Sequence, residues 1–284
     1  MHRANKPLCG KVALVTGASR GVGKGIATSL SLAGAIVYIT GRTIIEGKSA
    51  SGLNGTINKT AEEIEALGGI CIPIQCDHQN DKEVEKVFVK INNKHKRLDI
   101  LVNNVWGGYE HYTDGTEFWN EKGFWSLPLS RWDSMFASGV RAHYVASAMS
   151  VPLMIMRGEG LIVNLSFFSA QRTDKGVAYG AAKAATDHMS ACMAEELREH
   201  NITCISIYPG LVRTESVMRG AEYLDLSNSE SPQFIGRAIT ALASDPQIIS
   251  KSGRTVIAAE VAQEYGFTDI DGKQPRPISA EEIQ

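Results

Sequence analysis

Three side chains of this chain could together move a proton to or from an oxygen atom: Ser166, Tyr179 and Lys183. Tyr179 and Lys183 are four residues apart in an alanine-rich segment that predicts a helix, so both lie on one face of it. A tyrosine with its ordinary pKa of about 10 is a poor proton donor or base, and a nearby lysine cation lowers that pKa. Ser166 ends an apolar run and could hydrogen-bond the same oxygen. An ordinary surface Tyr–Lys pair is the alternative.

A glycine-rich loop follows the first apolar run of the chain. It reads Thr16-Gly17-Ala18-Ser19-Arg20-Gly21-Val22-Gly23 and precedes a helical pattern at 23–32. Glycines let a backbone approach a pyrophosphate, which then lies at the N-terminus of the following helix. We therefore predict that a dinucleotide binds at Gly17, Ser19, Arg20, Gly21, Val22 and Gly23. The spacing differs from the usual G-x-G-x-x-G, so a tight turn without a ligand is the alternative.

Two arginines indicate which dinucleotide this loop would bind. An NAD site usually has an acidic residue about 20 residues after the loop, bonded to the ribose 2′-hydroxyl. Here the second apolar run ends in Thr40-Gly41-Arg42-Thr43, without a carboxylate. Arg20 and Arg42 could both bind a 2′-phosphate, because a guanidinium pairs with phosphate through two hydrogen bonds. This favours NADP(H) over NAD(H), unless both arginines are simply solvated.

The elements that must position these residues alternate between strands and helices. Strands are predicted at 12–15, 35–39, 70–74, 99–102, 161–165, 202–207 and 254–258. Helices are predicted at 23–32, 58–67, 83–94, 128–156, 178–199 and 232–243, with Pro152 expected to break or kink the long one. The strands are apolar on both faces, as buried parallel strands are. The pattern predicts an α/β fold: one domain over 1–284, a doubly wound parallel sheet of about seven strands with helices on both faces.

Two segments stand apart from this alternation. The segment 106–132 holds all four tryptophans and follows the carboxyl end of a strand, where open α/β sheets bind ligands. We expect it to form an apolar wall or lid over a ligand site, with a local satellite core as the alternative. The C-terminal tail, 271–284, is polar.

Composition limits the partners of the chain. Its 284 residues carry a net charge of −2, so there is no basic surplus for nucleic acid. No apolar run is long enough for a membrane span, and we expect no membrane insertion. The five cysteines lack C-x-x-C spacing, so we expect no disulfide framework, no metal site and a reducing, cytoplasmic environment. A small-molecule substrate is expected.

Taken together, these motifs resemble the short-chain dehydrogenase/reductases, over roughly residues 8–257. Thr16–Gly23 is similar to the TGxxxGxG loop of the family, and Ser166 with Tyr179 and Lys183 is similar to its catalytic Ser and YxxxK. The resemblance implies further cofactor contacts at Asp77, Asn104, Pro209, Gly210, Val212 and Thr214, besides Tyr179 and Lys183. Simple alternatives are a turn at Asp77, a strand bridge at Asn104 and a helix cap at Thr214. The pattern at 140–144 is similar to the dehydrogenase/reductase member 1 subgroup.

The resemblance implies a sheet in the order 3-2-1-4-5-6-7 and a homodimer or homotetramer built on two long helices. In the NNAG motif, Val105-Trp106 replaces Ala-Gly. Two departures from the family pattern stand out. Gly139 falls where the family often has an asparagine that serves a proton relay, and the usual DGG after the last strand is missing, since the chain continues as Ala258-Ala259-Glu260-Val261 there. The leading hypothesis is an NADP(H)-dependent carbonyl reductase or alcohol dehydrogenase, with Tyr179 as general acid and base. Gly139 motivates the alternative, a non-catalytic or vestigial NADP(H)-binding scaffold protein.

Overall fold

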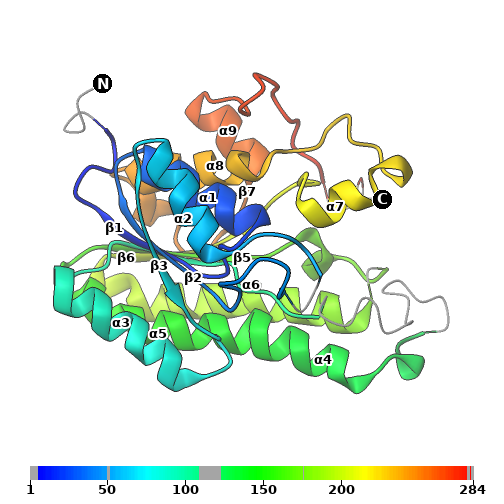
Figure 1. Ribbon diagram of the computed structural model, residues 1–284, viewed down its shortest axis with the longest axis horizontal. Helices are drawn as coiled ribbons and strands as arrows, with labels where there is room; N and C mark the ends of the chain where they lie inside the picture. The colour runs from blue at the N-terminus through cyan, green and yellow to red at the C-terminus, as the bar shows by residue number, and fades with distance from the viewer. Residues whose placement is uncertain (1–5, 50–51, 109–122, 175, 280–281, 283–284) are drawn as a thin grey trace.

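A seven-stranded parallel sheet runs through the centre of the molecule (Figure 1). The computed structural model describes residues 6–49, 52–108, 123–174, 176–279 and 282. The strands are β1 (Val12–Val15), β2 (Ile36–Gly41), β3 (Ile70–Gln75), β4 (Ile100–Asn103), β5 (Gly160–Leu165), β6 (Ile202–Tyr208) and β7 (Thr255–Ile257). Their order is β3-β2-β1-β4-β5-β6-β7, and β1 pairs with β2 from Val12 opposite Ile36. The predicted fold class and strand order are confirmed.

Helices cover both faces of the sheet, as predicted. One face carries α1 (Gly21–Leu32), α2 (Ile57–Ala66), α8 (Pro232–Ser244) and α9 (Ala258–Tyr265). The other carries α3 (Asp81–His95), α5 (Ala142–Ile155) and α6 (Val177–Leu197) (Figure 1). The remaining α-helices of the described residues are α4 (Leu129–Phe136) and the short α7 (Glu215–Arg219). Each face of the sheet therefore has its own apolar core, and the site-bearing loops emerge between the two layers.

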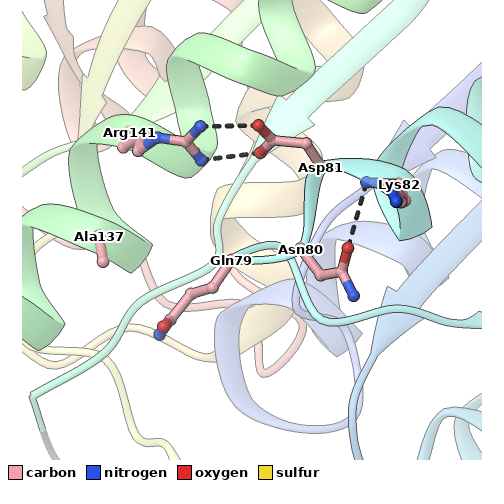
Figure 2. Close-up of a pocket in the computed structure, with 6 residues that line it drawn as sticks. All are labelled: Gln79, Asn80, Asp81, Lys82, Ala137 and Arg141. Carbon is pink, nitrogen blue, oxygen red and sulfur yellow. Dashed lines mark hydrogen bonds and ion pairs between the residues drawn. The ribbon is translucent and has the colours of Figure 1, made fainter.

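The long helix expected at 128–156 is interrupted elsewhere than predicted. A π-helical segment, η3 (Ala137–Arg141), separates α4 from α5, whereas Pro152 lies inside α5. The predicted break at Pro152 is wrong, because that residue lies in the last turn of α5, where little helix remains to be disrupted. Arg141 of η3 forms two hydrogen bonds of 2.7 Å with Asp81 at the start of α3 (Figure 2). The irregular segment is thereby tied to the neighbouring helix.

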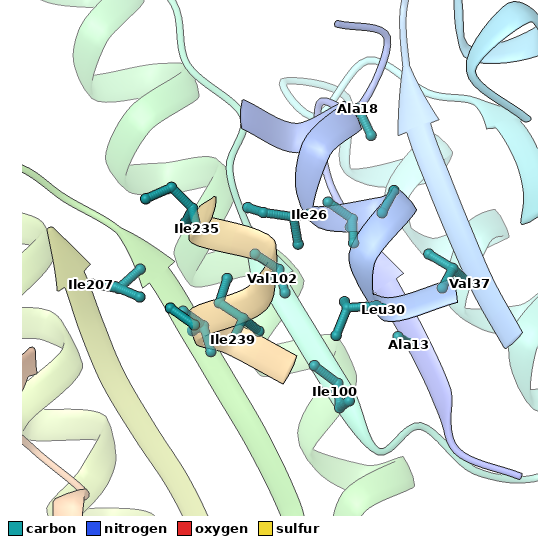
Figure 3. Close-up of a cluster of buried hydrophobic side chains, with 14 of the residues drawn as sticks. Ala13, Ala18, Ile26, Leu30, Val37, Ile100, Val102, Ile207, Ile235 and Ile239 are labelled. Atoms are coloured by element: carbon teal, nitrogen blue, oxygen red, sulfur yellow. The ribbon is translucent and has the colours of Figure 1, made fainter. Parts of the chain in front are cut away.

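The glycine loop leads into α1, and α1 packs very closely on α8. Ile26 of α1 and Ile239 of α8 belong to the same core cluster as the strand residue Val102 (Figure 3). Gly25 marks the closest approach, because a Cβ at this position would lie 2.2 Å from the carbonyl carbon of Pro232. Helix α1, whose N-terminus faces the strand ends, is therefore fixed in position by a helix more than 200 residues further along the chain.

Candidate active site

The carboxyl ends of the first four strands surround a cavity of about 200 Å³. The residues that line it are Gly17, Ser19, Arg20, Gly41, Arg42, Thr43, Cys76, Asp77, His78, Asn104, Val105, Trp106 and Ser138. Six of the predicted cofactor-binding residues are among them. The cavity lies where doubly wound sheets bind their ligands, beside the crossing from β1 to β4.

The glycine loop fits a dinucleotide at this cavity. Gly17 has a φ of +68°, and a Cβ there would lie 3.1 Å from the Cα of Val105. A Cβ at Gly23 would lie 2.4 Å from the carbonyl oxygen of Gly17. The Asn104 side chain donates hydrogen bonds to the carbonyls of Thr16 and Gly17 at 2.9 and 2.8 Å, so it forms the bridge that was the simple alternative for it. Gly17 and Gly23 thus leave the backbone of the loop open to close approach, as a pyrophosphate requires.

The side chain of Val22, the remaining predicted residue of the glycine loop, contacts the apolar core rather than the cavity. It is partly buried and packs against the apolar core beneath α1. Its side chain therefore anchors the first turn of the helix, whose N–H groups are the ones left for a ligand.

The two predicted phosphate-binding arginines lie at the same cavity. Arg20 already donates hydrogen bonds of 2.9 Å to the carbonyls of Asn54 and Gly55. Burial lowers the pKa of Arg20, and the positive charge of Arg42 adds to this effect, while Glu215 and Glu46 oppose it. An anion between the two guanidinium groups would relieve their mutual repulsion.

A carboxylate that the sequence did not single out faces the glycine loop. Glu215, the first residue of α7, accepts a hydrogen bond of 3.3 Å from the backbone N–H of Gly21. It therefore lies at the N-terminus of α1, where an anion is favoured by the helix dipole. Thr214 caps α7 by accepting a hydrogen bond from the N–H of Val217, the simple alternative considered for it.

Asp77 lines the cavity from a turn after β3. Its Oδ1 accepts a hydrogen bond of 3.0 Å from the N–H of Gln79, so the turn alternative is also realised. Gln79 in turn donates to the hydroxyl of Ser138 at 2.8 Å and links the cavity to the groove in Figure 2. Arg141 and Asp81 form the exposed side of that groove.

Ser166, Tyr179 and Lys183 are brought together at the end of β5. The Ser166 hydroxyl donates to the main-chain carbonyl of Lys183 at 3.3 Å. The Lys183 Nζ donates to the carbonyl of Leu165 at 3.1 Å and lies 5.9 Å from the ring centroid of Tyr179. Lys183 is only 7% exposed, and burial lowers its pKa to about 8. An almost dry ammonium group thus lies beside the tyrosine ring.

Trp106 completes this cluster. Its ring lies 5.3 Å from the Tyr179 ring at an interplanar angle of 90°, and the Lys183 Nζ lies 4.1 Å from its centroid. The first residue of the aromatic segment therefore lies at the site, whereas residues 109–122 of that segment lie outside the described residues, so the expected wall or lid stays a prediction. Trp119 lies outside the described residues, and Trp132 stacks on Phe136 away from this cluster.

The sequence did not predict a buried network of hydrogen bonds that lies beside the site, among β4, β5 and α5. Asn103 donates to the side-chain oxygen of Asn164 at 2.8 Å and to the Ser147 hydroxyl at 2.9 Å. His143 hydrogen-bonds the carbonyl of Val105 through Nε2 at 2.9 Å, and burial, reinforced by the charge of Lys183, lowers its pKa to about 3. His143 is therefore neutral and donates this bond. The network ties β4 and β5 to α5.

The loop after β6 contacts the glycine loop, since a Cβ at Gly21 would lie 3.5 Å from the Thr214 side chain. Pro209 follows β6 directly, and Val212 forms an isolated bridge with Glu230. A Cβ at Gly210 would lie 2.8 Å from a carboxylate oxygen of Glu230. Burial raises the pKa of Glu230 to about 7. The predicted loop residues are thus held by a buried carboxylate that carries no sequence signal.

Within the described residues, no helix is long and apolar enough to cross a membrane, and no cluster of three or more potential metal-ligating side chains occurs. All five cysteines lie in the described part of the chain and are free.

Comparisons with known proteins agree with the motifs. The short chain dehydrogenase family model matches residues 11–223. Dehydrogenase/reductase SDR family member 1 of Mus musculus is 39% identical over 284 aligned residues, which cover 94% of this chain and 85% of that protein. The human protein of the same name is 38% identical, with the same coverage. The 7alpha-hydroxysteroid dehydrogenase of Escherichia coli K12 is 29% identical over 75% of each chain.

Solved structures show the same fold. A 7α-hydroxysteroid dehydrogenase complexed with NADH and 7-oxo glycochenodeoxycholic acid superposes with a TM-score of 0.72 at 25% identity, over 96% of this chain and 99% of that one. A hydroxysteroid dehydrogenase from Escherichia coli gives a TM-score of 0.72 at 27% identity, over 88% and 95%. The chain therefore belongs to the short-chain dehydrogenase/reductase family of oxidoreductases, as its motifs predicted, and is similar to the member 1 proteins within that family.

Proposed function

We propose that this chain is an NADP(H)-dependent oxidoreductase that transfers a hydride between nicotinamide and a carbonyl or secondary alcohol. The observation that carries the proposal is the buried ammonium group of Lys183, which donates to the Leu165 carbonyl at the end of β5 and lies 5.9 Å from the centroid of the Tyr179 ring. A cation in that position is what a tyrosine needs to exchange a proton near neutral pH.

The residues of the chain have separate roles in this chemistry. Bound nicotinamide supplies the hydride in reduction and accepts it in oxidation. Tyr179 donates a proton to the carbonyl oxygen in reduction and takes one from the alcohol in oxidation. The charge of Lys183 stabilises the phenolate that this exchange leaves behind. Ser166 rotates its hydroxyl away from the Lys183 carbonyl and donates it to the substrate oxygen.

The cofactor preference rests on the arginine pair. The backbone of Gly17, Gly21 and Gly23 would receive the pyrophosphate, and Asn104 keeps that loop in place. Arg20 and Arg42 would share the 2′-phosphate of NADP(H), since they line one cavity and repel each other. One hydroxysteroid dehydrogenase of this fold is complexed with NADH, and a gluconate 5-dehydrogenase of this fold has bound NADP, so in this proposal the preference rests on the two arginines alone.

The surroundings of the site support a proposal for the substrate class. The indole of Trp106 faces the reacting tyrosine, so we propose an apolar or aromatic carbonyl compound as substrate. We also retain the expectations of a homodimer or homotetramer in the cytoplasm.

Two measurements test the proposal. Tyr179→Phe should abolish turnover of carbonyl compounds while leaving NADPH binding intact; retained turnover would refute the mechanism. Tyr144→Phe is the matched control, because this tyrosine is 57% exposed on α5. Titration with NADPH and NADH, followed by nicotinamide fluorescence, should show much tighter binding of NADPH. Equal or tighter NADH binding would overturn the assignment of Arg20 and Arg42.

A further inference from the structure

The ammonium group of Lys183 lies in an unusual chemical setting. An ammonium group has three N–H donors and no acceptor, and its removal from water is costly unless partners replace the water. The carbonyl of Leu165 accepts one of these hydrogen bonds at 3.1 Å. The face of the Trp106 indole, 4.1 Å from Nζ to the centroid, covers another side of the cation. Tryptophan offers the most favourable aromatic face for a cation, and the effect grows when water is excluded.

The same indole orients the tyrosine. The rings of Trp106 and Tyr179 meet at 90° with centroids 5.3 Å apart, the edge-to-face geometry that aromatic pairs prefer. One side chain therefore contacts both members of the Tyr179–Lys183 pair. Neither could change its rotamer without losing a contact to this ring.

The space for this indole exists because residue 139 is a glycine. A Cβ at Gly139 would lie 2.4 Å from one ring carbon of Trp106 and 2.6 Å from the next. Gly139 belongs to the π-helical segment η3, and its carbonyl accepts a hydrogen bond from the Thr186 hydroxyl of α6, one turn after Lys183. The Trp106 ring thus packs directly on the backbone of Gly139. The hydrogen bond from Thr186 fixes this backbone to α6, the helix that also carries Lys183.

We infer that Trp106 is a positioning residue for the Tyr179–Lys183 pair, that it keeps the Lys183 ammonium charged and in place, and that Gly139 acts by admitting the indole. This inference rests on the proposed function for its catalytic consequence. The contact between Trp106 and Lys183 itself is independent of any turnover.

The first test measures the contact in the protein without cofactor. Lysine labelled with ¹³C at Cε gives a resonance for Lys183 that is identified by its loss in Lys183→Met. In the wild type this resonance should be shifted upfield by the indole ring current and should titrate near pH 8. Trp106→Leu should remove the ring-current shift and lower the midpoint by about half to one pH unit. Trp106→Phe should give an intermediate value, and Trp132→Leu, at a tryptophan that stacks on Phe136, should change nothing.

The second test measures the catalytic consequence. With NADPH and a carbonyl substrate, Trp106→Leu should lower kcat at least about tenfold, by a larger factor than it weakens NADPH binding, because the ring also lines the cofactor cavity. Trp106→Phe should retain most of kcat. Gly139→Ala should cause a loss similar to that of Trp106→Leu in the wild-type background and little additional loss in the Trp106→Leu background, because the collision partner is then gone.

The outcomes separate the two proposals. An unchanged Lys183 midpoint and chemical shift in Trp106→Leu would overturn the positioning role, whatever the activity. A normal titration and ring-current shift, combined with turnover that survives Tyr179→Phe, would overturn the proposed function and leave the contact standing. Independent effects of Gly139→Ala and Trp106→Leu would overturn the role assigned to Gly139.

Discussion

Replacing Glu215 by glutamine should tighten the binding of NADPH. The carboxylate of Glu215 accepts a hydrogen bond from the N–H of Gly21, in the first turn of α1. In the proposed function, the pyrophosphate of the cofactor binds at this same turn. NADPH must therefore displace the carboxylate or bind beside a like charge, and glutamine keeps the size of the side chain without the charge.

The magnitude depends on which of these two happens. A carboxylate at a helix N-terminus is stabilised by about 0.3–1 kcal/mol at an exposed position, and this is lost on displacement. Two unit charges about 4 Å apart in water repel by about 1 kcal/mol, which physiological salt reduces. Glu215 is exposed and its bond to Gly21 is long, 3.3 Å, so values near the lower end apply. The expected gain is therefore about 0.5–1 kcal/mol, which corresponds to a twofold to fivefold lower Kd.

The assay is fluorescence titration of the purified chain with NADPH, which requires no knowledge of the substrate. Glu222→Gln makes the same chemical change seven residues further along, at an exposed position in a short helical turn, and should leave Kd unchanged. The advantage of Glu215→Gln should be largest at low ionic strength and should shrink at about 1 M salt, where the Debye length is about 3 Å.

Unchanged or weaker NADPH binding in Glu215→Gln would refute the reasoning, since it would mean that the carboxylate does not compete for the glycine loop. An advantage that persists undiminished at high salt would also contradict it, because a change in loop packing rather than charge would then be responsible.

Two further predictions concern the free energy of unfolding. Lys183 has a pKa of about 8 when folded and about 10.4 when unfolded, so the unfolded chain binds more protons between these values and wild-type stability rises with pH there. Lys183→Met should therefore be about 3 kcal/mol more stable than the wild type at pH 7, and urea titrations should show this gain disappearing above about pH 10. A constant gain across that range would argue against a buried charge. Gly25→Ala should cost about 1–3 kcal/mol, because its Cβ would meet the Pro232 backbone at 2.2 Å. Gly220→Ala, with nothing within 4 Å, should change thermal unfolding little, and similar losses in both variants would refute the steric argument.

The sheet could be predicted because its signal is local. Parallel strands covered on both faces must be apolar at every position, and β1 and β6 are buried along their whole lengths. The course of the helix at 128–156 could not be predicted in the same way. Pro152 carries a local signal for a break, but the irregular segment lies at 137–141, where Gly139 contacts α6 and an indole from another loop.

The candidate site shows the same division. Ser166, Tyr179 and Lys183 could be placed together because two lie one helical turn apart and the third ends a strand next to that helix. The environment of Arg20 could not be predicted, since its guanidinium binds the carbonyls of Asn54 and Gly55, more than 30 residues away. Neither could the carboxylate on the glycine loop, because Gly21 and Glu215 are 194 residues apart.

Two of the departures from the family pattern, at Trp106 and Gly139, are related in a way that the sequence does not show. In the sequence, Trp106 and Gly139 are separate anomalies: a large ring where a glycine is common, and a glycine where an asparagine is common. In the structure they are one feature, because the ring occupies the volume in which any side chain at Gly139 would collide. A single change at either position would leave a cavity or an overlap beside Lys183, whereas the two together fill the space and give the buried ammonium an aromatic partner. The absent asparagine is therefore poor grounds for a vestigial site, since the volume beside the lysine has been refilled by a side chain that contacts both residues proposed to exchange the proton.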